Sequence, residues 1–164
     1  KQMKSLDAIA QTVIEKPDLK LVMVQVASRE SEKELLALAM AKEMYYQKKI
    51  LVTQKDSLSL EDYRAIEAIS NKDSLFTIWL NQQLLPEDVS ILPNQLKCRK
   101  YIGNEKLTEL VNKLFATRNK LLLDYFAISR GIDSTRIKIS DTSDETSAQF
   151  ESTPRYTVEF AAEE

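Results

Sequence analysis

The sequence contains no histidine, one cysteine and two glycines among its 164 residues. The absence of histidine removes the commonest general base and the imidazole metal ligand, together with every Ser-His-Asp or Cys-His arrangement in its usual form. Gly103 and Gly131 are too few to build the glycine-rich loop of a P-loop or of a dinucleotide-binding fold. The single thiol, Cys98, forms neither an intrachain disulfide nor a thiolate metal cluster. Of the usual catalytic groups, lysine and the carboxylates remain.

Charge and hydropathy set further limits on the class of protein. Lys and Arg number 23 and Asp and Glu number 25, so the net charge of -2 provides no positive field for binding nucleic acid. No apolar run approaches the roughly 20 residues of a membrane-spanning helix, and we recognise no signal peptide. Since the chain begins with Lys1 rather than methionine, we expect a piece of a longer protein whose targeting segment lies upstream.

The first third of the sequence predicts a helix, a strand and a second helix, which is typical of an α/β fold. Residues 6–14 carry apolar side chains at helical spacing, with Ser5 as the expected N-cap. Residues 19–27 are apolar on both alternating faces, which predicts a strand that is either covered on both sides or central in its sheet. Ser31 and Glu34 fit a capping box that opens the next helix.

The middle of the chain, about 48–102, breaks the alternation of helices and strands. Residues 60–69 and 74–85 predict two helices that begin after the N-caps Ser59 and Asp73. We therefore interpret the region as a helical insertion.

Three further features of this insertion lead to predictions. Pro86 and Pro93 bracket a segment that is expected to be turn-like. A weaker alternative makes residues 49–53 an edge strand. Trp79 stands at helical spacing among other apolar residues, and a packing role is expected for it rather than a ligand platform.

The last third predicts a long helix and two strands. The helix over 104–126 is expected to end at Gly131 in a left-handed conformation. Residues 136–139 form a short strand, and residues 140–154 are a polar surface loop. Residues 156–160 alternate and predict a half-buried strand that pairs antiparallel with its predecessor. The expected buried stripe of the helix is Leu107, Leu110, Val111, Leu114, Phe115, Leu121, Leu122, Tyr125 and Phe126.

This order of elements resembles the OmpA-like fold over Ser5 to Tyr46 and Leu107 to Phe160. The family's motif of an arginine, an apolar run, a tyrosine and Gly-Ile is matched by Arg118, Leu122, Tyr125, Phe126, Gly131 and Ile132. The resemblance implies an α/β (α+β) fold, a βαβαββ-type sandwich of a small mixed sheet and helices. It also implies a single domain over 1–164, which the helical insertion interrupts.

In OmpA-like domains an aspartate and an arginine hold the charged ends of a peptidoglycan stem peptide through paired hydrogen bonds. The resemblance places Arg118 at the arginine position, whereas Ser28, followed by Arg29, stands where the aspartate is expected. Half of the clamp is therefore missing, and Glu30 replaces it only if the turn is rearranged. The alternative role for Arg118 is structural, paired with an acid such as Glu109 or with a main-chain carbonyl.

A second resemblance covers nearly the whole chain, insertion included. It is to the domain of unknown function at the C-terminus of large AsmA-like envelope proteins. It implies a periplasm-facing domain of a membrane-anchored protein involved in outer-membrane assembly or lipid traffic, with other envelope proteins as partners. The matching motifs are Leu6-Asp7-Ala8-Ile9-Ala10, Pro17-Asp18-Leu19-Lys20-Leu21, Gly131-Ile132-Asp133-Ser134-Thr135-Arg136 and Arg155-Tyr156-Thr157-Val158-Glu159-Phe160.

The remaining acidic residues do not form a catalytic pattern. Glu61-Asp62 and Glu87-Asp88 stand at helix starts, where carboxylates favour the helix dipole. The acidic stretch from Asp141 to Glu145 lacks the order of a calcium loop. We therefore expect a non-catalytic domain with no cofactor and no metal site, and carboxylate catalysis is the alternative.

Tyr45 and Tyr46, close to Met40 and Met44, are the expected contact face for a partner, since tyrosine and methionine suit adaptable interfaces. Burial of these side chains in the core is the alternative.

Overall fold

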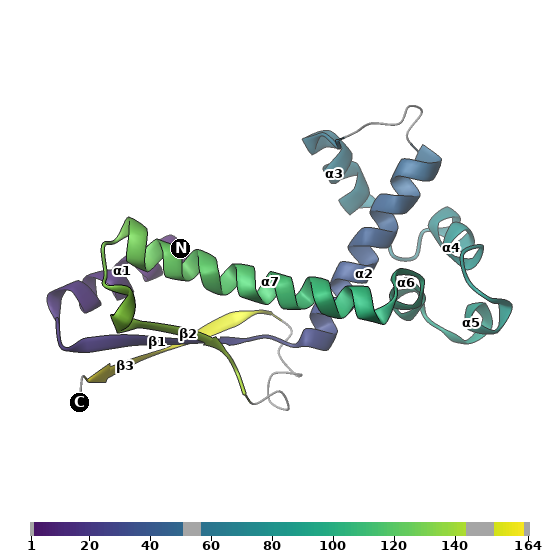
Figure 1. The fold of residues 1–164 in the computed structure, drawn as a ribbon. Coiled ribbons are helices and arrows are strands. Elements are labelled where there is room, and N and C mark those ends of the chain that lie inside the picture. The colour runs from purple at the N-terminus through teal and green to yellow at the C-terminus, as the bar shows by residue number, and fades with distance from the viewer. Residues whose placement is uncertain (1, 51–56, 144–152, 163–164) are drawn as a thin grey trace. The chain divides into compact units, whose positions relative to one another are not determined.

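The computed structural model describes residues 2–50, 57–143 and 153–162. These residues form helices and a small mixed sheet (Figure 1). In chain order, one helix and one strand precede a series of helices, and the longest described helix then leads to two further strands. The α/β character predicted from the sequence is therefore confirmed.

The chain divides into two compact units. The sheet unit consists of Lys1–Ser28 and Asn112–Glu164, and the helical unit consists of Arg29–Val111. The helical unit contains the insertion that the sequence places at about 48–102 and extends beyond it at both ends.

Strand β1 (Leu19–Val26) is the central strand of the sheet unit, as its apolar faces predict. Strand β2 (Ile137–Asp141) pairs with one of its edges in parallel, and strand β3 (Arg155–Ala162) pairs with the other edge in antiparallel orientation. The prediction that the final strand pairs with its predecessor is wrong. Since β1 is the most apolar strand, placing it between the two late strands buries its side chains better than an edge position would.

The register of the three strands aligns their side chains in rows, because paired residues point to the same face of a sheet. On one face, called the covered face here, the rows are Ile137, Leu21 and Phe160; Ile139, Met23 and Val158; and Asp141, Gln25 and Tyr156. On the opposite, open face the rows are Lys138, Val22 and Glu159, and Ser140, Val24 and Thr157, with Val26 beside Arg155 at the end.

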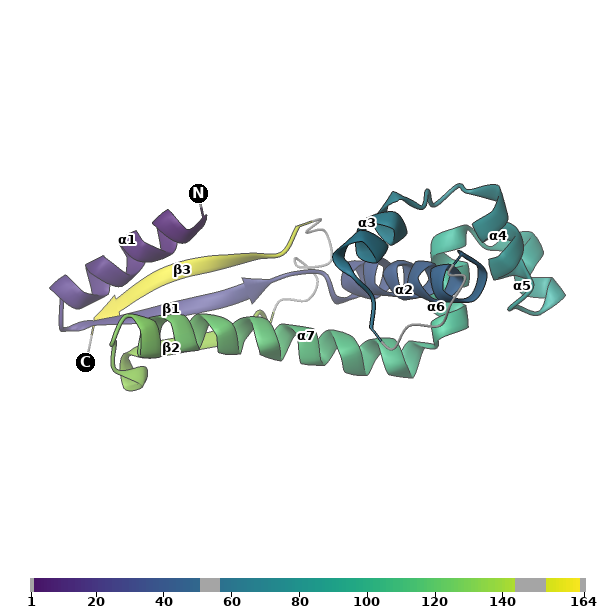
Figure 2. The same cartoon turned by 90° about the horizontal axis from the view of Figure 1, so that it is seen from above.

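Helix α1 (Gln2–Glu15) and the later turns of α7 (Asn104–Asp124) lie on the covered face (Figures 1 and 2). Their apolar stripes meet the first two rows of that face and form the core of the sheet unit, except at Phe160, which is 44% exposed. The buried members of this core are Ala10, Val13, Leu21, Met23, Phe126, Ile132 and Ile137.

The long helix ends as the sequence predicts. Beyond α7 the chain continues through a π-helical turn, Tyr125–Ser129, and reaches Gly131 with a φ of +67°. This left-handed conformation confirms Gly131 as the stop, since a side chain disfavours it. The expected buried stripe is confirmed in part, because Leu121 is 64% exposed. Its buried members are Leu107, Val111, Phe115 and Phe126, and its partly buried members are Leu110, Leu114, Leu122 and Tyr125.

The starts of the first two helices differ from the predictions. Helix α1 already begins at Gln2, so Ser5 lies within it rather than at its N-cap. Helix α2 (Arg29–Tyr45) begins before Ser31, so Ser31 and Glu34 do not form the expected capping box. Its first turn instead contains Glu30 and Glu32, whose charges favour the amino end of the helix dipole.

The helical unit contains the predicted α3 (Leu60–Ala68) and α4 (Ser74–Asn81), although α4 ends before the predicted Leu85. Ser59 caps α3 in a capping box with Asp62, and the side chain of Asp73 caps α4. Both N-caps are thus confirmed, because local sequence signals determine them.

The segment between Pro86 and Pro93 was expected to be turn-like and instead forms helix α5 (Pro86–Ile91). Proline is favoured at the first position of a helix, where no amide donor is needed. Helix α6 (Asn94–Ile102) follows.

The alternative edge strand at 49–53 lies largely outside the described residues. Its first two residues belong to a π-helical turn, Tyr46–Ile50, which continues α2. Of the predicted loop at 140–154, Ser140 and Asp141 belong to β2, and residues 144–152 lie outside the described part of the chain.

Aromatic side chains form the centre of the helical unit. Trp79 is 3% exposed, and its ring centroid lies 5.5 Å from that of Tyr45 and 5.6 Å from that of Tyr101. The packing role expected for Trp79 is confirmed. The buried members of this core are Ala37, Ala41, Tyr45, Phe76, Trp79, Leu80, Cys98 and Leu107.

One arginine joins the first helix to the sheet. Arg136, at the entry to β2, donates hydrogen bonds of 2.8 and 2.9 Å from its Nη2 to the carbonyl oxygens of Val13 and Lys16. It also donates from Nε and Nη2 to the carbonyl of Leu19, at 3.1 and 2.8 Å. A single guanidinium therefore binds the end of α1, the following turn and the start of β1.

We expect Arg136→Ala to lower the free energy of unfolding by about 2–3 kcal/mol, because the three carbonyl acceptors lose charged donors. Urea denaturation of the whole chain, followed by far-ultraviolet circular dichroism, measures the change. The control Lys113→Ala, at an exposed position of α7, should shift stability by less than about 0.5 kcal/mol. Equal stability of the two variants would contradict this role of Arg136.

Candidate functional site

Arg118, the arginine that the sequence singles out, lies on α7 within the sheet unit. It is partly buried, and its guanidinium carbon lies 5.8 Å from the centre of the Phe115 ring. Its positive charge also acts on the phenol of Tyr156 on β3. The arginine therefore lies near the third row of the covered face.

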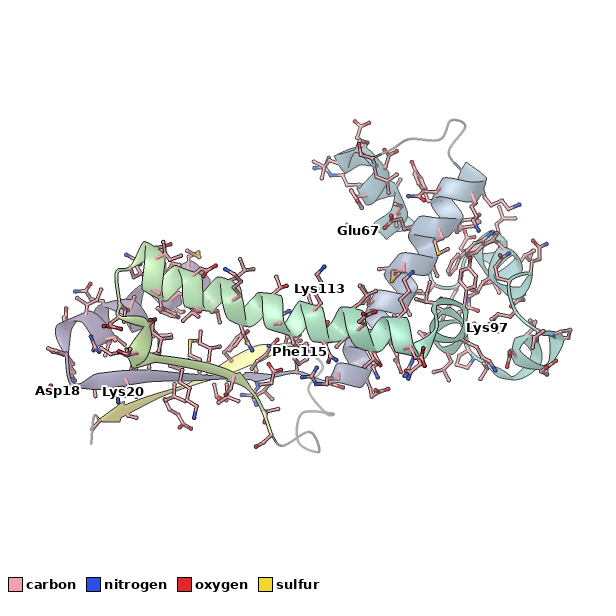
Figure 3. The ribbon with its side chains drawn as sticks, viewed as in Figure 1. Asp18, Lys20, Glu67, Lys97, Lys113 and Phe115 are labelled. Carbon is pink, nitrogen blue, oxygen red and sulfur yellow. The ribbon has the colours of Figure 1, made fainter. Side chains whose placement is uncertain are left out.

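That row is polar and is joined by hydrogen bonds to α7. We call Gln25, Asn119, Asp141 and Tyr156 the polar row. Gln25 Nε2 donates to Asn119 Oδ1 and to Asp141 Oδ1, both at 3.0 Å, and to the carbonyl of Phe115 at 3.3 Å. Figure 3 labels Phe115 on α7 beside the sheet.

The other two members close the network. Asn119 Nδ2 donates to Asp141 Oδ1 at 2.9 Å, and the Tyr156 hydroxyl donates to Asn119 Oδ1 at 2.7 Å. One side chain from each strand and one from α7 are thus linked. The row lies at the carboxyl ends of the parallel strands β1 and β2, the edge where α/β sheets commonly bind ligands.

Two observations describe the electrostatics of the polar row. Burial raises the pKa of the Tyr156 phenol to about 12, and the charge of Asp141 adds to the rise while that of Arg118 opposes it. Gln25 is completely buried, and its Oε1 has no hydrogen-bond partner within the described structure. The side-chain hydrogen bonds of Gln25 in the described structure are therefore made by its amide nitrogen.

Ser28 and Arg29, the other two residues at the expected clamp, lie at the boundary of the two units. Ser28 follows β1 and is only 4% exposed, and Arg29 is the first residue of α2. Both interact with other parts of the described structure. Since neither serine nor arginine has a carboxylate, these two residues do not replace the aspartate of the expected clamp.

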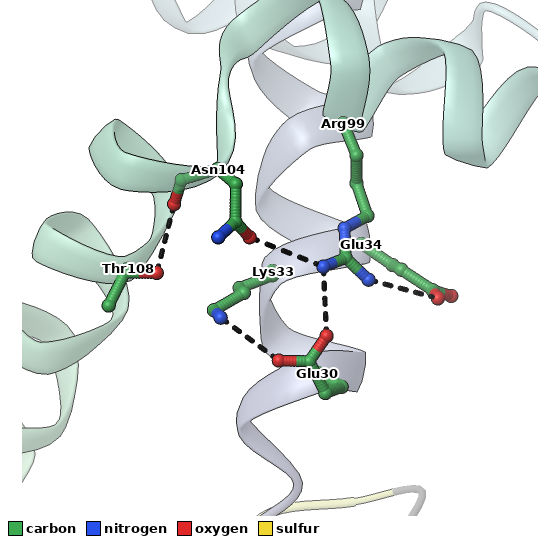
Figure 4. Close-up of polar contacts among 6 residues, drawn as sticks. All are labelled: Glu30, Lys33, Glu34, Arg99, Asn104 and Thr108. Atoms are coloured by element: carbon green, nitrogen blue, oxygen red, sulfur yellow. Dashed lines mark hydrogen bonds and ion pairs between the residues drawn. The ribbon is translucent and has the colours of Figure 1, made fainter.

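Glu30, the acid considered as a replacement, belongs to an ion-pair network within the helical unit (Figure 4). Its carboxylate accepts from Lys33 Nζ at 2.9 Å and from Arg99 Nη2 at 2.8 Å. These contacts, the hydrogen bond from Lys33 first, lower the pKa of Glu30. Arg99 also lies 3.8 Å from Glu34 and 3.4 Å from the side-chain oxygen of Asn104. The network ties α2 to α6 and to the start of α7.

The tyrosines expected on a contact face are both buried. Tyr45 is 7% exposed and packs against Phe76 with 5.5 Å between ring centroids. Tyr46 is 8% exposed, and its hydroxyl donates to Asp62 Oδ1 at 3.0 Å. The expectation that Tyr45 and Tyr46 form an exposed contact face is thus wrong. The alternative, burial in the core, is what the structure shows, because the helices of the insertion cover these rings.

Sequence reasoning did not identify the polar row. Its members are spread over more than a hundred residues, and the strand register alone brings them together. One signal was present, since Gln25 is the only uncharged polar residue in Leu-Lys-Leu-Val-Met-Val-Gln-Val. A buried amide at this position needs hydrogen-bond partners from the neighbouring elements.

Three further features bear on function: metal ligands, the cysteine thiol and membrane-spanning helices. Within the described ranges, no three His, Cys, Asp or Glu side chains come together as a potential metal site. Cys98 is buried, and burial raises the pKa of its thiol to about 11. No helix among the described residues is both long and apolar enough to span a bilayer.

Comparisons with known proteins do not assign the chain to a family. No protein-family model matches it, and neither the curated proteins nor the solved structures contain a detectable match.

The raised pKa of Tyr156 predicts how the stability of the folded chain changes in alkaline solution. The phenol is neutral in the folded state up to about pH 12, whereas it ionises near its ordinary value of 10 once the chain unfolds. Its contribution to stability is therefore complete below pH 10 and is lost as the pH rises toward 12. In Tyr156→Phe we expect a smaller alkaline loss of stability and one fewer late-ionising tyrosine in the near-ultraviolet absorbance titration. An unchanged titration would contradict the assignment.

Proposed function

We propose that this chain is a non-catalytic interaction and structural domain at the C-terminal end of a membrane-anchored AsmA-like protein. The domain faces the periplasm and contacts other envelope proteins of outer-membrane assembly or lipid traffic. The motif resemblance over nearly the whole chain supports the family and the location. The polar row supports a non-catalytic role, because its side chains hydrogen-bond one another across the sheet and α7.

The acidic residues considered for catalysis also have structural contacts in the described part of the chain. Asp62 is 5% exposed and accepts hydrogen bonds from Ser59 and Tyr46. Asp88 pairs with Lys100 Nζ at 2.6 Å. General acid or base catalysis needs a carboxyl group that reaches a substrate, and these two carboxylates are engaged at helix ends.

Protease accessibility tests the location. The full-length protein is expressed with a tag beside this chain, and protease is added to intact cells and to spheroplasts. We expect the chain to be protected in intact cells and cleaved in spheroplasts, because added protease reaches the periplasmic face of the inner membrane only in spheroplasts. Protection in both preparations, with cleavage only after lysis, would contradict the proposal.

A peptidoglycan anchor is the second candidate, and one observation favours it. Asp141 accepts a hydrogen bond from Asn119, the residue that follows Arg118 on α7, and both charges act on the Tyr156 phenol, so a guanidinium and a carboxylate lie near the same end of the sheet. Asp141 would then take the place of the aspartate missing at Ser28. Such a pair matches the amine and carboxylate of a stem peptide.

Co-sedimentation with purified peptidoglycan sacculi separates the two candidates. If the domain acts through protein partners, wild type, Arg118→Ala and Asp141→Asn all remain in the supernatant. If it is an anchor, wild type sediments and both substitutions reduce binding by about tenfold or more, since each removes a charge-assisted contact. Lys113→Ala is the matched control, because Lys113 lies on the side of α7 that points away from the sheet (Figure 3). Binding that Lys113→Ala lowers equally would be nonspecific charge attraction and would contradict the anchor.

A further inference from the structure

The open face of the sheet carries an apolar stripe between two charged edges. Val22, Val24 and Val26 point to this face from the central strand and are partly exposed. In the sheet unit, α1 and α7 both lie on the other face (Figures 1 and 2). The core of the sheet unit is built on that covered face.

Charges of opposite sign flank the stripe at the same height. Lys138 on β2 and Glu159 on β3 both pair with Val22, and both side chains are exposed. Between them lies β1, so the two charges are separated by two strand spacings of about 4.8 Å each. Lys138 and Glu159 are thus not on adjacent strands of the same sheet.

The next row is uncharged. Ser140 on β2 and Thr157 on β3 flank Val24, so both edges present a hydroxyl group in this row. The middle of the face is therefore apolar along its centre, positive at Lys138 and negative at Glu159, while Lys20 and Arg155 stand at the two ends of the face. A surface of this kind is complementary to a copy of itself.

We propose that a second copy of this chain packs on the open face and forms a two-fold symmetric, two-sheet sandwich. A two-fold axis parallel to β1 places β2 of one copy opposite β3 of the other and keeps every row at its own height. Lys138 of each copy then faces Glu159 of the second copy, which gives two ion pairs. The valines of the two stripes face one another between these pairs.

The remaining positive charge on β1 does not oppose this arrangement. Lys20 lies four residues before Val24, at the beginning of the strand. Two aligned sheets cross at about 30°, so strands diverge away from the centre of the interface. With the crossing at Val24, the two Lys20 side chains are carried apart, and their ends reach solvent.

The size of the face sets the strength of the dimer. Three strands and five paired residues cover a few hundred Å², which is less than the roughly 800 Å² that each partner buries in a standard interface. We therefore expect dissociation constants on the order of 100 μM at low salt. The ion pairs make the association weaker as salt is added.

Sedimentation velocity of the whole chain over a concentration series tests the dimer. We expect the mean mass to rise toward that of two chains for the wild type. Lys138→Glu alone and Glu159→Lys alone each create two like-charge contacts and should weaken the dimer by about tenfold. Lys113→Glu, which makes the same charge change on α7, should leave the dissociation constant within about twofold of the wild type.

Mixing the two charge-reversal variants provides the decisive result. In a heterodimer of Lys138→Glu with Glu159→Lys, both facing pairs have opposite charges again, so the equimolar mixture should associate as the wild type does. A wild type that stays monomeric at all concentrations would overturn the proposal. So would single variants that dimerise normally, or a mixture that associates no better than either variant alone.

Discussion

The amide nitrogen of Gln25 is the group on which the sheet unit depends. It lies completely buried in the central strand and reaches α7 and β2, while Asn119 carries the network on to β3. In a low-dielectric interior such a network is strong when its donors are paired and costly when they are not. A one-residue slip of β1 would place a valine in this row and turn Gln25 to the open face. The hydrogen bonds therefore select one register, which apolar packing alone specifies less sharply.

This register also divides the sheet into two faces with different roles. The covered face holds the core and the polar row, which includes Asp141, and Arg118 lies near that row. The open face carries Val22 between charges of opposite sign. An interaction domain of the kind that we propose would thus keep its polar groups for its own architecture and offer a largely apolar surface for association. The peptidoglycan alternative would use the polar end of the covered face instead.

The sequence predicts best those features that local chemistry determines. The N-caps of α3 and α4 are set by the side chains of Ser59 and Asp73, as predicted. The stop after the long helix is set by Gly131, which has no side chain and adopts the predicted left-handed conformation. The central position of β1 also follows from its composition. The partner of β3 could not be predicted this way, because pairing with β1 or β2 satisfies the same alternating pattern. The polar row was missed for the same reason, since its four members meet only once that non-local pairing exists.

The central position of β1 has a consequence for the order in which the chain folds. The strand is made early, but β2 begins about 110 residues later, and at roughly 5–20 residues per second the ribosome needs on the order of 10 s to supply it. During this interval β1 has two unpaired edges and an apolar composition, which is the signature of an aggregation-prone nascent segment. Early collapse of Arg29–Val111 shortens the flexible chain that must close around β1 and so lowers the entropic barrier to completing the sheet. The helical residues would thereby act as a folding aid for the strand that precedes them.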